Sequence, residues 1–171
     1  RNASVVVYTP DGTVLGSAPL QGSMVSIYPG SFRGPLLLKL VDTGGGQYWD
    51  ESTRQWTSLQ GVTLHAMLPS LTHHVSINPL TEAAYQYALA RVRGEPALTA
   101  AAMQQANDAV LAQVNAKLAS TYQTSDITNF ATLLDDTTGT DTIPNTWAGR
   151  FAALLAAMPI AGKQFNGTLT A

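Results

Sequence analysis

Hydrophobic and polar residues alternate with a two-residue period in the first part of the chain, and apolar residues recur every three or four positions in most of the rest. The first period indicates β-strands and the second α-helices. The change falls in residues 77–92, INPLTEAAYQYALARV. Here Asn78 is a suitable N-cap, Pro79 suits the first helical position, and Glu82 lies in the first turn, where the helix dipole favours a negative charge. We therefore predict that a helix begins at Pro79.

The part before residue 78 contains short apolar runs separated by turn residues. A β-branched run in residues 4–8 leads through Pro10 and Gly12 into a second strand, which predicts a hairpin. Residues 36–41, LLLKLV, predict a central strand with its leucines on one face and Lys39 on the other. Further strands are expected at residues 24–28, 48–49, 56–57, 62–68 and 75–77. About seven strands at spacings of roughly ten residues indicate a β-sandwich.

The part after residue 78 predicts helices. The first ends near Gly94, and Thr99 can cap a second, whose apolar stripe comprises Met103, Ala106, Val110, Val114 and Leu118. A third helix is expected after Asp126 and a fourth after Pro144. The predicted fold class is α+β: an immunoglobulin-like β-sandwich in residues 1–77 packed on a bundle of about four helices in residues 78–162. Residues 163–171 are expected to form a strand-like tail or a linker to a following module.

Composition limits the classes of function. Only 12% of the residues are charged, about half the usual share, and threonine is frequent, which is common on secreted and surface proteins. Nine Lys and Arg residues are scattered along a chain with a net charge of −2, so we expect no nucleic-acid partner. The longest apolar run, residues 151–161, is too short for a membrane span. Cysteine is absent, which excludes disulfides and thiolate metal sites.

Candidate catalytic and metal-binding groups do not form a recognisable set. The three histidines are His65, His73 and His74; we expect His65 and His74 to face solvent, and no third ligand has a suitable spacing. Ser31 is not in a nucleophile elbow, because Pro29 stands where the G-x-S-x-G motif has its first glycine. Residues 135–142, DDTTGTDT, lack the ordered ligands of a calcium loop, so we interpret them as a solvated turn. We therefore predict no enzymatic activity, no cofactor and no metal, while calcium binding by Asp135, Asp136 and Asp141 stays open.

Two other segments are candidates for contact with partners. Tyr48, Trp49 and Trp56 flank a polar hairpin tip and are expected either to pack against the sheet or to bind a glycan or peptide. Phe165 and Leu169 lie in the strand-like tail, which can pair with a free sheet edge of another copy or of an adjacent module.

Five segments together resemble a recurring unit of bacterial secreted and surface proteins. They are residues 5–15, GPLLLKLVD, QYWDESTRQWTSLQGVTLHAMLPS, INPLTEAAY and AMQQANDAV. The unit is found in large repeat proteins and lipoproteins with carboxypeptidase-regulatory-like or immunoglobulin-like β modules. It combines a Y-x-D/E hairpin, a PLTE-x-A entry into a helix and an AN-x-x-V helix.

The resemblance implies an extracellular or cell-surface location in a bacterium and a non-enzymatic role. From it we expect a structural or adhesive module that can assemble end to end, with other copies or adjacent modules as partners. A glycan- or peptide-binding module that uses the Tyr48, Trp49 and Trp56 hairpin is the alternative.

Overall fold

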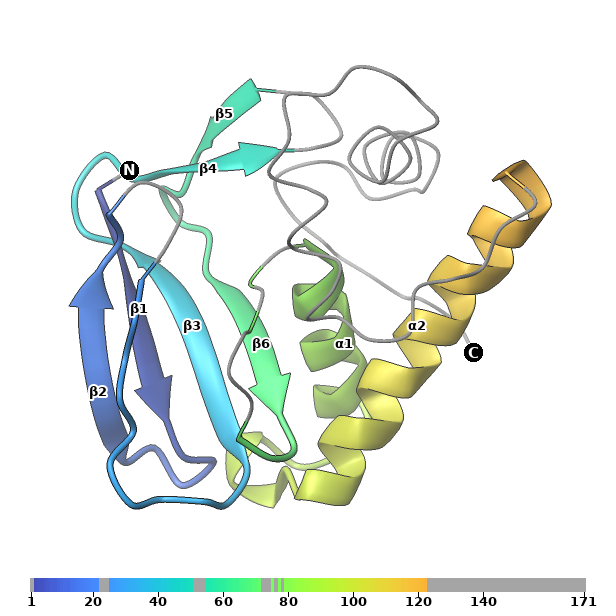
Figure 1. The fold of residues 1–171 in the computed structure, drawn as a ribbon, viewed down its shortest axis with the longest axis horizontal. Helices are drawn as coiled ribbons and strands as arrows, with labels where there is room; N and C mark the ends of the chain where they lie inside the picture. The colour runs from blue at the N-terminus through green and yellow to red at the C-terminus, as the bar shows by residue number, and fades with distance from the viewer. Residues whose placement is uncertain are drawn as a thin grey trace.

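The computed structural model describes residues 2–21, 25–50, 55–71, 75, 77 and 79–122, which form a four-stranded antiparallel sheet, a separate β-hairpin and two α-helices (Figure 1). The sheet has the order β2-β1-β3-β6, with all neighbours antiparallel. Its strands are β1 (Ala3–Tyr8), β2 (Val14–Pro19), β3 (Leu36–Asp42) and β6 (Leu64–Leu68). The hairpin consists of β4 (Gln47–Asp50) and β5 (Gln55–Ser58). The helices are α1 (Pro79–Leu89), the short 3-10 helix η1 (Glu95–Ala97) and α2 (Ala100–Tyr122).

The predicted N-terminal hairpin and central strand are confirmed. The turn between β1 and β2 is held by Asp11, whose carboxylate accepts the Thr13 backbone N–H at 2.9 Å and the Thr9 hydroxyl. Gly12 takes φ 93°, a left-handed conformation in which a side chain would be strained. The register slips near Val14, where the pairing of β2 with β1 contains a bulge. β3 lies between β1 and β6, as its apolar sequence predicts.

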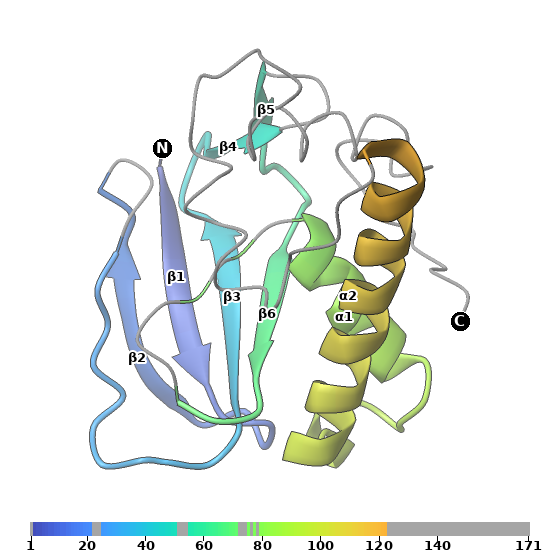
Figure 2. The ribbon, with the colours of Figure 1, turned by 45° about the vertical axis from the view of Figure 1, so that its right-hand side comes forward.

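The helices cover one face of the sheet with a shared hydrophobic core. Consecutive strand residues alternate between faces, and Tyr8, Leu37 and Met67 lie in one cross-strand row on the helix side. They are buried together with side chains of both helices, which include Leu80, Ala84, Met103, Ala106 and Val110. α1 and α2 pack side by side next to β6 (Figure 2). The described part of the chain therefore joins sheet and helices through one apolar layer.

The opposite face of the sheet is covered by irregular chain. Its central row consists of Val5, Leu40 and Leu64, and these buried residues pack with Leu59. The remaining cover comes from half-buried side chains of connecting segments: Leu20, Val25, Ile27, Val62 and Ile77. Residues 25–28, 75 and 77 were expected to be in strands, but they have no strand assignment in the structure.

The predicted fold class is therefore wrong. The structure shows one four-stranded sheet and two α-helices in its described residues, and neither a β-sandwich nor a four-helix bundle. The physical reason is that alternating apolar residues, such as Val25 and Ile27, reach the core from an extended segment without entering a strand ladder. The third and fourth helices expected from the sequence lie outside the described residues.

The predicted starts of the first two helices are confirmed. α1 begins at Pro79 and carries Glu82 in its first turn. At the start of α2, the Thr99 hydroxyl accepts the Ala102 backbone N–H at 3.1 Å, the N-cap expected from the sequence. In the stripe of α2, Met103, Ala106 and Val110 are buried as predicted. Neither described helix combines the length and the apolar character that a bilayer span requires.

Candidate functional site

β6 is an edge strand, and the register of the sheet determines which of its backbone groups face outward. The Thr43 N–H donates to the Asn2 carbonyl at 3.0 Å, so these two residues form a hydrogen-bonded pair next to β1 and β3. Hydrogen-bonded and non-hydrogen-bonded pairs alternate along antiparallel strands, which makes Val6 and Lys39 a bonded pair. Lys39 then forms a non-bonded pair with His65 on β6. The backbone N–H and C=O of His65 therefore point away from the sheet.

Glu82 of α1 closes this edge at His65. One of its carboxylate oxygens, Oε2, accepts the His65 backbone N–H at 2.5 Å and the His65 Nδ1–H at 2.8 Å. The other oxygen, Oε1, accepts the Gln86 amide at 2.8 Å from the next turn of the helix. The Glu82 side chain is 8% exposed and that of His65 is 14% exposed. A carboxylate that receives three donors in a buried place holds α1 at one position along β6.

Asn107 of α2 closes the same edge two residues further on. Met67 has the same parity as His65, so its backbone groups also face outward. The Asn107 side-chain amide donates to the Met67 carbonyl at 3.2 Å. Each long helix thus contributes one polar side chain to the free backbone of β6.

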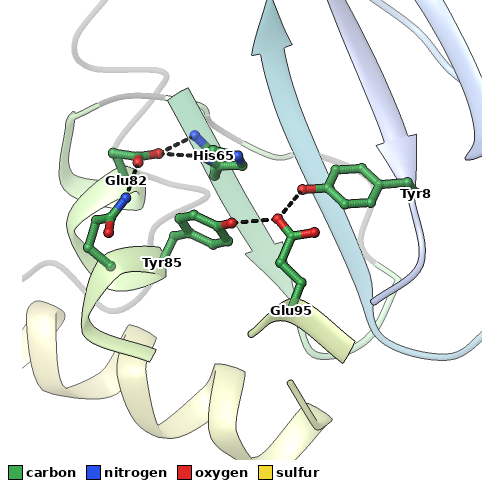
Figure 3. A network of polar contacts seen from close by, with 6 residues as sticks. Tyr8, His65, Glu82, Tyr85 and Glu95 are labelled. Carbon is green, nitrogen blue, oxygen red and sulfur yellow. Dashed lines mark hydrogen bonds and ion pairs between the residues drawn. The ribbon is translucent and has the colours of Figure 1, made fainter. Parts of the chain in front are cut away.

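Glu95 of η1 makes a second polar contact between the sheet and the helices (Figure 3). Its Oε1 accepts the hydroxyl of Tyr8, from β1, at 2.8 Å and also accepts the hydroxyl of Tyr85, from α1. Both tyrosines are buried. The two sets of contacts meet where the ring of Tyr85 stacks on that of His65, with centroids 3.9 Å apart and planes 15° apart. The network Tyr8–Glu95–Tyr85–His65–Glu82 therefore runs from β1 to the edge of β6.

The electrostatics of this network favour neutral tyrosines. Burial raises the pKa of both Tyr8 and Tyr85, and the hydrogen bond to Glu95 and its negative charge raise these pKa values further. The ammonium of Lys39 lies 5.0 Å from the centroid of the Tyr8 ring, over its face. Each hydroxyl is therefore a donor fixed on a carboxylate, a role that positions the 3-10 helix against the sheet.

The sequence-based interpretation of His65 is wrong. It was expected to face solvent, because Thr63 and other polar residues alternate with the apolar positions of its strand. In the structure its ring lies on the helix side, covered by Tyr85 and bonded to Glu82. The sequence did not show this pairing, because a Glu in the first turn of a helix is explained by the helix dipole alone and Glu82 stands 17 positions from His65. His73 and His74 lie outside the described residues.

The hairpin prediction is confirmed, and the register divides its aromatic residues. Trp49 and Trp56 are direct cross-strand partners, whereas Tyr48 is paired with Thr57. Neighbouring residues of a strand belong to opposite faces, so the three aromatics do not form one platform. Trp56 is 40% exposed, while Thr57 is buried.

The other candidates lie largely outside the described part of the chain. This applies to Asp135, Asp136 and Asp141 of the acidic loop and to Phe165 and Leu169 of the tail. Within the described residues, no three His, Cys, Asp or Glu side chains group as a metal site. The three glycines at 44–46 form a loop in which the Asp42 carboxylate accepts the N–H groups of Gly44 and Gly46 at 2.7 and 2.6 Å. These bonds lower the pKa of Asp42.

No protein-family model, curated protein or solved structure matches this chain. The geometry of the described residues is therefore the basis for any functional conclusion.

Proposed function

We propose that the chain is a non-enzymatic structural or adhesive module that acts outside a bacterial cell or on its surface. The low share of charged residues, the frequent threonine and the absence of cysteine support this location. The resemblance of the hairpin, the helix entry and the second helix to units of bacterial surface proteins favours it as well. Such a module extends a surface protein, presents its other parts or attaches it to a target surface.

The observation that carries the proposal is the use of the buried and partly buried polar side chains. Glu82, Asn107 and Glu95 each join a helix to a backbone group or a hydroxyl of the sheet. His65, the only histidine in the described residues, is bonded to Glu82 and covered by Tyr85. Groups suited to acid–base chemistry thus hold two layers together, which is a structural role.

Beads coated with the purified chain test the adhesive role, since an adhesive module should hold them on its target surface. We expect His65→Ala and Glu82→Ala to lower the unfolding midpoint, while beads coated at a temperature where both variants are folded adhere as the parent does. Complete loss of adhesion by folded variants would show that these groups act at a site. Protease treatment of intact cells that carry the native protein tests the location. Release of its peptides only after lysis would contradict an extracellular module.

End-to-end assembly is part of the same proposal. The tail sequence KQFNGTLTA, with Phe165 and Leu169 alternating with polar residues, is suited to strand addition at a sheet edge of another copy or module. The N-terminal strand β1 is an interior strand of its sheet, so it has no free edge that could accept the tail, and the acceptor has to be another strand. Light scattering of the chain with and without residues 163–171 tests this: larger species are expected for the full chain alone, and identical monomers would refute assembly.

A further inference from the structure

One face of the β4–β5 hairpin consists of aromatic and uncharged polar residues. Trp49 pairs with Trp56 and Gln47 pairs with Ser58, so these four residues share one face by register. Burial alternates along the second strand: Thr57 and Leu59 are buried, whereas Trp56, Ser58 and Gln60 are exposed. The face that carries Trp56 is therefore the outer face of the hairpin.

The hairpin is held in place at its base. Leu59, which follows β5, is completely buried in the apolar cluster on the sheet face opposite the helices. Its backbone N–H donates to the Gly46 carbonyl at 2.9 Å, directly before β4. The hairpin forms a two-stranded sheet of its own beyond the end of the main sheet where β1 begins (Figures 1 and 2). An anchored hairpin presents its outer face with little loss of conformational entropy on binding.

We propose that this outer face, with the side chains of Gln47, Trp56 and Ser58, binds a neutral saccharide. The inference deepens the adhesive role proposed above and rests on it. The apolar C–H face of a sugar ring packs on an indole, and its hydroxyl groups exchange hydrogen bonds with amide and hydroxyl side chains. Trp56 supplies the first kind of contact, and its neighbours on this face, Gln47 and Ser58, supply the second.

The charge of this face selects among ligands. None of the three residues Gln47, Trp56 and Ser58 is ionisable, so these side chains offer no charged partner for a carboxylate, sulfate or phosphate group. An acidic glycan would bring a charge that must be desolvated without compensation. A large, partly exposed tryptophan is the residue type that most often dominates a binding surface, which makes Trp56 the central contact.

An oligosaccharide array tests the proposal with the full chain as the probe. The array carries neutral oligosaccharides of hexoses and N-acetylhexosamines beside sialylated and sulfated ones. We expect binding to neutral members, and Trp56→Ala should weaken it by about tenfold or more, as expected for loss of an aromatic hot spot. Trp56→Phe should retain part of the affinity. The control is Tyr28→Ala, which removes an aromatic side chain that is 80% exposed and lies outside the hairpin.

Four outcomes would overturn the proposal: no binding to neutral members, preference for the acidic ones, equal affinity of the parent and Trp56→Ala, or displacement by an unstructured peptide and not by free oligosaccharide. The unfolding midpoint of each variant is measured alongside, so that loss of folding is recognised, and Trp56→Phe then decides. Bead adhesion separates the two proposals. Adhesion that persists in Trp56→Ala refutes the saccharide face and leaves the adhesive role intact, whereas absence of adhesion by the parent refutes both.

Discussion

The two edges of the sheet are closed by different means. At the β6 edge, side chains from both long helices bind the outward N–H of His65 and the outward C=O of Met67. At the β2 edge, the outward positions follow from the bond between the Leu20 N–H and the Ala3 carbonyl at 2.8 Å, which makes Ser17 an outward-facing residue and Pro19 the next. Pro19 has no N–H, and a bulge interrupts the strand near Val14.

The comparison shows two solutions to one problem. A free strand edge invites pairing with another chain unless it is covered or broken. The β6 edge is covered, so its polar groups contribute to the stability of the fold and depend on the helices. At the β2 edge, Pro19 and the bulge reduce the number of outward backbone groups that can pair with another strand. Ser17 still has an outward N–H and C=O. Substitutions near β6 should therefore change stability, and substitutions in β2 should change association.

The largest effect is expected from Leu80→Ala. Leu80 is fully buried at the start of α1, in the layer that joins the helices to the sheet. Its truncation should lower the free energy of unfolding by about 2 to 5 kcal/mol in urea titrations. The control is Val14→Ala in β2, where the side chain is 61% exposed and a change within about 0.5 kcal/mol is expected. Equal, small effects would contradict docking of α1 on the sheet.

Glu82→Ala should come next, with a loss of about 3 kcal/mol, because three donors lose their acceptor in a buried place. Glu82→Gln is the matched variant: it keeps one oxygen for His65 but turns a donor toward a donor, so its loss should be smaller. Ser17→Ala in the other edge should have little effect. A Glu82→Ala protein as stable as the parent would show that the β6 edge does not need this cap.

The stability of the fold should depend on pH in opposite directions at two places, the tyrosines bonded to Glu95 and Asp11 in the β1–β2 turn. The pKa values of Tyr8 and Tyr85 are raised in the folded state, so their contribution is complete below the unfolded pKa of about 10 and is lost as pH rises above it. The pKa of Asp11 in the β1–β2 turn is lowered by bonds from Thr9 and Thr13, so its contribution is lost as pH falls below about 4.

Unfolding titrations at several pH values check this expectation. A protein with Tyr8→Phe and Tyr85→Phe should lose about 1.5 to 3 kcal/mol of stability at neutral pH for each of the two hydrogen bonds to the Glu95 carboxylate. On going to alkaline pH it should lose less stability than the parent. Asp11→Asn should instead reduce the loss of stability that occurs as the pH falls below about 4. Unchanged alkaline behaviour of the double variant would show that the bonds to Glu95 do not stabilise the fold.

A smaller effect is expected from Asn107→Asp. The substitution keeps the shape of the side chain but turns a carboxylate oxygen toward the Met67 carbonyl in place of the amide donor. We expect a loss of about 1 to 2 kcal/mol at neutral pH. Gln105→Glu makes the same amide-to-acid change at an exposed position of α2 and controls for charge. A similar loss in both variants would mean that the Met67 contact is not the cause.

The smallest effect on stability, within about 0.5 kcal/mol, is expected from Pro19→Val. This substitution restores an outward N–H two residues from Ser17 and so extends the free part of the β2 edge. Its effect should appear as dimers or larger species in light scattering at high concentration. The variant and the parent are both compared without residues 163–171, because the tail is itself a proposed donor strand. An unchanged monomer would show that Pro19 does not protect this edge.

The sequence by itself determined the local elements of this protein. Turn chemistry at Asp11 and Gly12, the leucine run of β3, the start of α1 at Pro79 and the Thr99 cap all act over a few residues, and each was predicted correctly. The β4–β5 hairpin was predicted as well, whereas its register, which pairs Trp49 with Trp56, was not.

Only the tertiary structure decided what lies on the two faces of the sheet and what the polar residues do. Val25 and Ile27 have the period of a strand, yet they cover the core from irregular chain, since burial requires an apolar side chain and not a ladder. Glu82 reaches His65 across 17 positions, and Tyr8 reaches Glu95 across 87. Such pairs depend on which edge the helices cover, and no local pattern encodes that choice, because contacts between distant residues are set by how the layers pack.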